Sequence, residues 1–174
     1  MNLADGIALA RAVAVLPVIV LVATGSDTLA LVVFAAAALS DAIDGPVARA
    51  RDEVTARGEW LDPLADKVLI AGTLAALAAR GLVPLWALVI VFGRELAAIA
   101  VRSRSPHPLP ATADGKAKTV LQALAVAMTL LAADAGSAPL AATAAIVLAA
   151  ALGLTVVSGL RLILRAAQTA AHAR

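Results

Sequence analysis

Long apolar runs, rather than an alternation of apolar and polar positions, dominate this chain. A helix needs about 20 residues to cross a bilayer, and the chain has six candidate spans, separated by Gly, Pro, Ser or charged positions. Their apolar runs cover residues 12–23, 28–40, 68–79, 84–101, 118–133 and 139–164. The second span continues through the charged residues 41–51, and the third begins with the charged residues 59–67. The pattern predicts a single all-α integral membrane domain over residues 1–174, with six transmembrane helices. Residues 2–11 are more polar and are expected to form an N-terminal interfacial amphipathic segment.

Composition supports a membrane protein. Hydrophobic residues make up 62% of the 174 positions and charged residues 15%, whereas a soluble domain has roughly 45–50% and about 25%. A water-soluble protein is therefore excluded. Cysteine is absent, which excludes disulfides, thiolate metal sites and cysteine nucleophiles. Basic residues do not interleave with aromatic ones, so no nucleic-acid partner is expected.

Basic residues gather on one side of the predicted membrane, and the opposite turns hold only Arg80. Six spans place both termini on the basic side, which the positive-inside rule identifies as cytoplasmic. We therefore expect a multi-pass protein of the cell membrane. A cleavable signal peptide is the alternative interpretation of the first run, but five further spans favour a retained helix. The basic side contains Arg11, Arg49, Arg51, Arg57, Arg102, Arg104, Lys116, Lys118, Arg161, Arg165 and Arg174.

Four aspartates lie where the second and third predicted helices approach the cytoplasm. Asp41 and Asp44 are three positions apart, and Asp62 and Asp66 are four apart, so each pair shares a helix face. All four lie about 20–26 Å from the outer ends of their helices, at matched depth. A short connection makes the two helices antiparallel neighbours. The carboxylates should then form one cluster, and one or two hard divalent cations, Mg²⁺ or Mn²⁺, would remove their mutual repulsion.

The alternative is an interfacial collar in which these acids pair with neighbouring Arg and Lys residues. Four unpaired acids at one depth would each cost a few kcal/mol, which favours the metal site. A further alternative is a cation channel or transporter that uses the acids as an ion path. Such a protein would distribute acids through the bilayer, whereas the outer part of every span lacks them.

The same stretch resembles the signature of the CDP-alcohol phosphotransferase family, D-x2-D-G-x2-A-R-x8-G-x3-D-x3-D. Members are six-span enzymes, usually homodimers, that displace CMP from a CDP-linked lipid by an alcohol and use divalent metal. All eight positions match, which disfavours a non-catalytic scaffold. The matching residues are Asp41, Asp44, Gly45, Ala48, Arg49, Gly58, Asp62 and Asp66.

The resemblance implies a role for each aspartate. Asp41, Asp44 and Asp62 would be metal ligands, and Asp66 would complete the metal site and act as the base on the attacking hydroxyl. Metal neutralises a diphosphate and stabilises the leaving oxygen of an in-line displacement.

The remaining signature positions are implied to contact the nucleotide. Gly45 and Ala48 would let cytidine approach the backbone, and Arg49 would meet the nucleotide or its diphosphate. Gly58 would also bind nucleotide, although a turn or helix-start glycine explains it equally well.

Outside the signature, residues 62–96, 115–122 and 155–159 resemble family members whose acceptor is glycerol 3-phosphate. The implied reaction joins CDP-diacylglycerol to glycerol 3-phosphate and releases CMP. Phosphatidylglycerol or inositol phosphate remain alternative acceptors, because the N-terminal stretch departs from that group at Ala4, Asp5 and Ala8.

A phosphorylated acceptor requires cations. We expect Arg94, Lys116, Lys118 and Arg161 to bind its phosphate. The alternatives are an intramembrane ion pair between Arg94 and Glu95, and positive-inside topology for the two lysines.

Overall fold

The computed structural model describes the backbone of residues 3–50, 58–104 and 113–172, and within them the side chains of residues 6–40, 64–101, 103, 115, 117–166 and 168. This part of the chain forms six helices and no strand, which confirms the predicted all-α class. The helices are α1 (Leu3–Ala23), α2 (Asp27–Ala50), α3 (Gly58–Ala79), α4 (Leu85–Arg104), α5 (Ala113–Ala135) and α6 (Ala138–His172).

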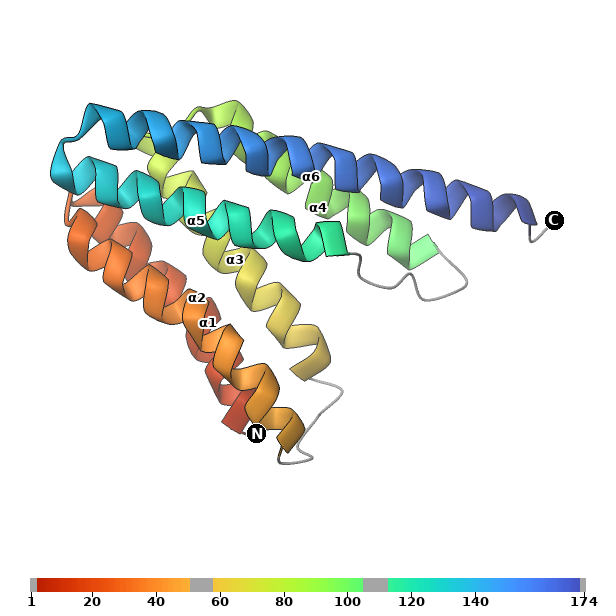
Figure 1. Cartoon of the computed structure of the whole chain (residues 1–174). Coiled ribbons are helices and arrows are strands. Elements are labelled where there is room, and N and C mark those ends of the chain that lie inside the picture. The colour runs from red at the N-terminus through yellow and green to blue at the C-terminus, as the bar shows by residue number, and fades with distance from the viewer. Residues whose placement is uncertain (1–2, 51–57, 105–112, 173–174) are drawn as a thin grey trace.

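The helices run alternately up and down, so three short turns lie at one end of the bundle (Figure 1, left). The turns after α1, α3 and α5 contain Gly25, Gly81 and Gly136, with φ of 78°, 72° and 57°. This left-handed conformation suits glycine, which ends a helix there without a Cβ clash. The start of α1 and the end of α6 lie at the opposite end, as six antiparallel helices require.

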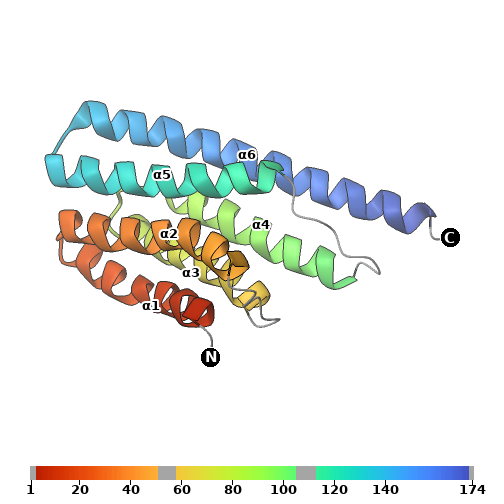
Figure 2. The ribbon, with the colours of Figure 1, turned by 60° about the horizontal axis from the view of Figure 1, so that its bottom comes forward.

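The helices form two sets that pack along a shared core. Helix α1 packs against α2 and α3, α6 packs against α4 and α5, and α2 contacts α5 between the sets. Buried side chains such as Phe34, Leu74, Val126 and Leu130 fill the core. The first three helices slant away from the last three toward the end where the termini lie (Figures 1 and 2).

Large apolar side chains also cover the outside of every helix, including Val20, Leu39, Val89, Val120 and Ile146, the last 70% exposed. A soluble protein rarely exposes so much contiguous apolar surface, whereas lipid tails solvate it without penalty. The exterior is therefore that of a membrane protein.

Three helices are long and apolar enough to cross a membrane by length and composition, within the described residues. These spans are Gly6–Ala23 of α1, Ala117–Ala135 of α5 and Ala138–Ala166 of α6, and the apolar part of α2, Asp27–Ser40, is shorter. Helices α2, α3 and α4 carry charged residues toward one end, which reduces their hydropathy. Their crossing of the membrane stays a prediction.

Three helix limits differ from the sequence expectation. The polar start is continuous with the first span from residue 3 onward, because α1 runs unbroken from Leu3 to Ala23 and buries Ala8 and Arg11. Helix α5 begins at Ala113 rather than Lys118, since no proline follows position 110 there. Helix α6 continues to His172, beyond the end of its apolar run, because the last residues are mostly good helix formers.

Polar side chains join the helices at the turn end. Arg80, the single basic residue of this end, makes two hydrogen bonds to the carboxylate of Asp27, one of them 3.2 Å long. Asp27 is buried, with 4% of its surface exposed. The hydroxyl of Thr28 donates to Asp134 on α5. The charge of Arg80 is thus neutralised locally.

Candidate functional site

Asp66, the predicted base, is held by an arginine of the first helix. Arg11 donates from a terminal nitrogen to Asp66 Oδ1 at 3.1 Å, and from Nε to Ser40 Oγ at 3.2 Å. The Ser40 hydroxyl in turn donates to the Ala37 carbonyl at 2.8 Å. The Arg11 side chain is fully buried and that of Asp66 is 26% exposed. Arg11 therefore ties the Asp66 carboxylate to α2 at the position just before Asp41.

The other signature aspartates lie on the expected helices. Asp41 and Asp44 are in the second half of α2 and Asp62 is in the first half of α3, and these two helices are antiparallel. Their side chains are outside the described residues, so their clustering stays a prediction. The nucleotide positions stay predictions for the same reason: Gly45, Ala48 and Arg49 on α2, and Gly58 at the start of α3.

The described part of this region contains one carboxylate of the predicted metal site, that of Asp66. A carboxylate oxygen is the donor that Mg²⁺ and Mn²⁺ prefer, and the Asp66 carboxylate is held in place by Arg11. Among the described side chains, no group of three or more acidic or histidine residues could hold a metal ion. Asp66 is the only signature aspartate in that set, so the metal site itself stays untested.

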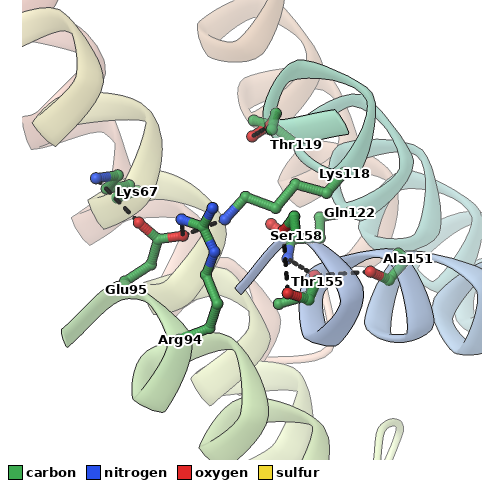
Figure 3. Close-up of polar contacts among 10 residues, drawn as sticks. Lys67, Arg94, Glu95, Lys118, Thr119, Gln122, Ala151, Thr155 and Ser158 are labelled. Carbon is green, nitrogen blue, oxygen red and sulfur yellow. Dashed lines mark hydrogen bonds and ion pairs between the residues drawn. The ribbon is translucent and has the colours of Figure 1, made fainter. Parts of the chain in front are cut away.

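A second charged group, the Glu95 cluster, consists of Lys67 on α3, Arg94 and Glu95 on α4, and Lys118 on α5 (Figure 3). Lys67 Nζ lies 2.9 Å from Glu95 Oε2, and Arg94 donates to Glu95 Oε1 at 2.9 Å. Lys118 donates to the same oxygen, Oε1. Three cations thus surround one carboxylate, and two positive charges remain in excess within the cluster.

Burial distinguishes these cations from ordinary interfacial charges. The side chain of Lys118 is 6% exposed and that of Arg94 11%, whereas that of Lys67 is 35% exposed. A positive-inside charge needs no such burial. The expected ion pair between Arg94 and Glu95 is present, and it belongs to a larger cluster that also contains the predicted phosphate ligand Lys118.

Helix α6 makes room for Arg94. A Cβ added to Gly159 would lie 3.2 Å from Arg94 Cγ, so the arginine stem crosses α6 where a side chain is missing. The Arg94 Nε is buried and has no hydrogen-bond partner among the described atoms. Nearby, Gln122 Nε2 on α5 donates to Thr155 Oγ1 on α6 at 2.9 Å, so a hydrogen bond joins these two helices (Figure 3).

Two predicted acceptor residues are not joined to this cluster by the described contacts. The Lys116 side chain is outside the described residues, and Arg161 on α6 has an exposed side chain. Their role in phosphate binding stays a prediction.

Sequence reasoning did not assign a site role to Arg11, Ser40, Lys67, Glu95 or Gly159. A signal existed for Glu95 and Lys67, because charged residues inside predicted membrane spans are costly unless paired. Gly159 ends the stretch 155–159 that resembles family members, whereas Ser40 carried no comparable signal.

The helical membrane fold and a signature aspartate held within it define a class of enzyme. The model of the CDP-alcohol phosphatidyltransferase family matches residues 1–157, and the chain belongs to this family. It is therefore a membrane-bound phosphatidyltransferase, as the signature predicts.

Over the residues that align, curated relatives are about a third identical to this chain. A probable phosphatidylglycerophosphate synthase of Mycobacterium tuberculosis is 36% identical over 145 residues, which cover 82% of this chain and 68% of the relative. The CDP-diacylglycerol–glycerol-3-phosphate 3-phosphatidyltransferase of Bacillus subtilis is 36% identical over 103 residues, 58% of this chain and 53% of its own length. A CMP-forming cardiolipin synthase of Streptomyces coelicolor is 36% identical over 88 residues, covering 49% and 41%.

Proposed function

We propose that this protein transfers the phosphatidyl group of CDP-diacylglycerol to sn-glycerol 3-phosphate and releases CMP, a step of phospholipid biosynthesis. The observation that carries the proposal is the buried excess of positive charge in the Glu95 cluster, whose Lys67 directly follows Asp66 on α3. The names of the relatives from M. tuberculosis and B. subtilis support the same reaction.

The charge of the cluster favours an acceptor that carries phosphate. Free inositol or choline carries no anionic group for buried cations to bind, whereas a phosphate monoester accepts charge-assisted hydrogen bonds from Arg and Lys. Arg94 and Lys118 are the residues we assign to this phosphate, with Lys116 and Arg161 as further ligands. Asp66 and Lys67 are consecutive on α3, so the base and the cluster share one depth in the bundle.

Asp66 is assigned the proton transfer. Its carboxylate takes the proton of the acceptor hydroxyl while the oxygen attacks the phosphorus that carries diacylglycerol. The bond from that phosphorus to the CMP phosphate oxygen breaks, and CMP leaves. Arg11 fixes the orientation of the carboxylate during this transfer.

A divalent cation completes the proposal. Mg²⁺ or Mn²⁺, as two ions held by Asp41, Asp44, Asp62 and Asp66, would neutralise the diphosphate and stabilise the leaving oxygen. Gly45, Ala48, Arg49 and Gly58 would hold the cytidine nucleotide.

We further propose that both termini and the active site face the cytoplasm, that the protein lies in the cell membrane, and that it is a homodimer. The local neutralisation of Arg80 by Asp27 supports the orientation, because it leaves the turn end without unpaired basic charge among the described residues. Labelling of single cysteines, introduced at Ser26 or Gln168, with a thiol reagent that does not cross membranes tests the orientation. In sealed inverted vesicles the cytoplasmic face is outside, so the cysteine at position 168 should react and the cysteine at position 26 should not.

The experiment that tests the reaction is CMP release by the purified protein with CDP-diacylglycerol and Mg²⁺ or Mn²⁺. Glycerol 3-phosphate, inositol 1-phosphate, phosphatidylglycerol and free glycerol are offered separately. Release with glycerol 3-phosphate alone is expected. Release with phosphatidylglycerol alone would replace the proposed acceptor by that of a cardiolipin synthase, and no release with any acceptor would contradict the proposal.

A further inference from the structure

We infer that Glu95 is a positioning and specificity-determining residue, which holds Arg94 and Lys118 together as a receptor for a doubly charged phosphate. The inference rests on the proposed function, because it concerns the acceptor's phosphate. It adds a residue that the sequence reasoning treated only as an ion-pair partner.

The first argument is geometric. Glu95 Oε1 accepts from both Arg94 and Lys118, which come from different helices, and Oε2 faces Lys67 on a third helix (Figure 3). Two buried cations repel each other, and a carboxylate between them is the group that keeps both at one place. Without it, the flexible stems of Lys118 and Arg94 would separate the charged ends.

The second argument is a match of charge. The cluster retains two positive charges in excess of its one carboxylate. A phosphate monoester carries about −1.5 to −2 charges at neutral pH, so it balances the cluster, whereas the phosphodiester of phosphatidylglycerol carries a single negative charge. Glu95 thus sets the charge of the receptor to that of a phosphate monoester such as glycerol 3-phosphate.

The third argument is an available donor. The Arg94 Nε is buried with no hydrogen-bond partner among the described atoms, although a buried donor without a partner is costly. An anion beside the cluster would satisfy this donor. A terminal guanidinium nitrogen of Arg94 already donates to Glu95. The carboxylate therefore determines which donors of the guanidinium remain for a ligand.

The experiment compares wild type with Glu95→Gln and Glu95→Asp. Glutamine keeps the size of the side chain and removes its charge, whereas aspartate keeps the charge on a shorter stem. Asp27→Asn is the matched control, because it also removes a buried carboxylate charge from an arginine partner, at the turn end of the bundle.

Two readouts are measured. The first is the KM for glycerol 3-phosphate, with the KM for CDP-diacylglycerol and kcat determined in parallel. The second is the shift in Tm produced by glycerol 3-phosphate, with free glycerol as the blank and with no CDP-diacylglycerol or metal present. Inorganic phosphate serves as a second probe of the same receptor.

Glu95→Gln should raise the KM for glycerol 3-phosphate about tenfold or more, the effect of losing an interaction with a charged group, and should abolish the Tm shift. The KM for CDP-diacylglycerol should change less than twofold, and Glu95→Asp should recover part of both losses. Asp27→Asn should lower the Tm itself and leave both readouts for glycerol 3-phosphate as in wild type.

An unchanged or lower KM for glycerol 3-phosphate in Glu95→Gln would overturn the inference and leave the proposed function intact. Equal losses for both substrates, or the same losses in Asp27→Asn, would reduce Glu95 to a structural residue. A wild type that gains no stability from glycerol 3-phosphate and releases no CMP with it would overturn the proposed function, and the inference with it.

Discussion

Arg11 donates to the Oδ1 atom of Asp66 at 3.1 Å, although the two residues are 55 positions apart. The Arg11 side chain is fully buried between the first three helices, and it also bonds Ser40 on α2. Three helices therefore meet at one guanidinium, whose planar donors fix the direction of the carboxylate. The base of the proposed reaction is thus oriented before any substrate binds.

Arg11→Lys should reduce kcat about 100-fold, because a lysine cannot bond Ser40 and Asp66 in one plane and a small misplacement of a reacting group has an effect of this size. Ser40→Ala should reduce kcat less, since it leaves the bond to Asp66 in place. CMP release at saturating substrates measures both. Equal activity of Arg11→Lys and wild type would contradict the positioning role of Arg11.

Asp66→Asn should abolish turnover while the protein stays folded, because the amide cannot accept the proton of the hydroxyl. The circular dichroism spectrum and the Tm establish folding of the variant, and CMP release measures turnover. An active Asp66→Asn enzyme would remove the assignment of Asp66 as the base.

Removal of divalent metal with a chelator should stop CMP release by wild type, and added Mg²⁺ or Mn²⁺ should restore it. Binding of the metal to protein without substrate is measured by the Tm, which rises with ligand concentration when only the folded state binds. A chelated enzyme of undiminished activity would contradict the proposed metal site.

Lys118→Gln should raise the KM for glycerol 3-phosphate about tenfold or more, because the buried ammonium is assigned to the acceptor's phosphate. Arg80→Gln is the control, since it removes a cation from an ion pair at the turn end. The control should lower stability and leave this KM unchanged. A Lys118→Gln enzyme with the KM of wild type would exclude Lys118 from the acceptor site.

Gly72→Ala should destabilise the protein by about 1–3 kcal/mol, the usual effect of overpacking. A Cβ at Gly72 would lie 2.4 Å from Val15 Cγ2, so α1 and α3 would have to separate. Gly153→Ala is the control on α6, where nothing lies within 4 Å and alanine should be neutral or slightly stabilising. The free energy of unfolding in detergent measures both, and equal stability of the two variants would contradict the close approach of α1 and α3.

The apolar runs alone predicted the order and approximate extent of the helices, because a bilayer requires continuous apolar length. The turns at Gly25, Gly81 and Gly136 were also predictable from the polar and glycine positions between runs. The exact ends of the helices were harder to predict, since alanines and other good helix formers extend α6 beyond its apolar run.

The ion pair between the neighbours Arg94 and Glu95 was predictable, but the long-range pairing of charges was not. Sequence periodicity shows that Glu95 lies within a span, but not that its partners come from α3 and α5, 28 and 23 positions away. Arg11 was expected at the membrane interface and is instead buried against Asp66, because tertiary packing supplies the partner that makes burial of a charge tolerable. Long-range pairing of this kind is a property of the folded bundle.

The most direct test of the central claim is the transfer of labelled glycerol 3-phosphate into lipid by the purified protein, with CDP-diacylglycerol and Mg²⁺ present. We predict a labelled phospholipid that retains a terminal phosphate, formed in equal amount to CMP by wild type and absent with Asp66→Asn. Release of CMP without label in lipid, or label transferred equally well by Asp66→Asn, would contradict the account.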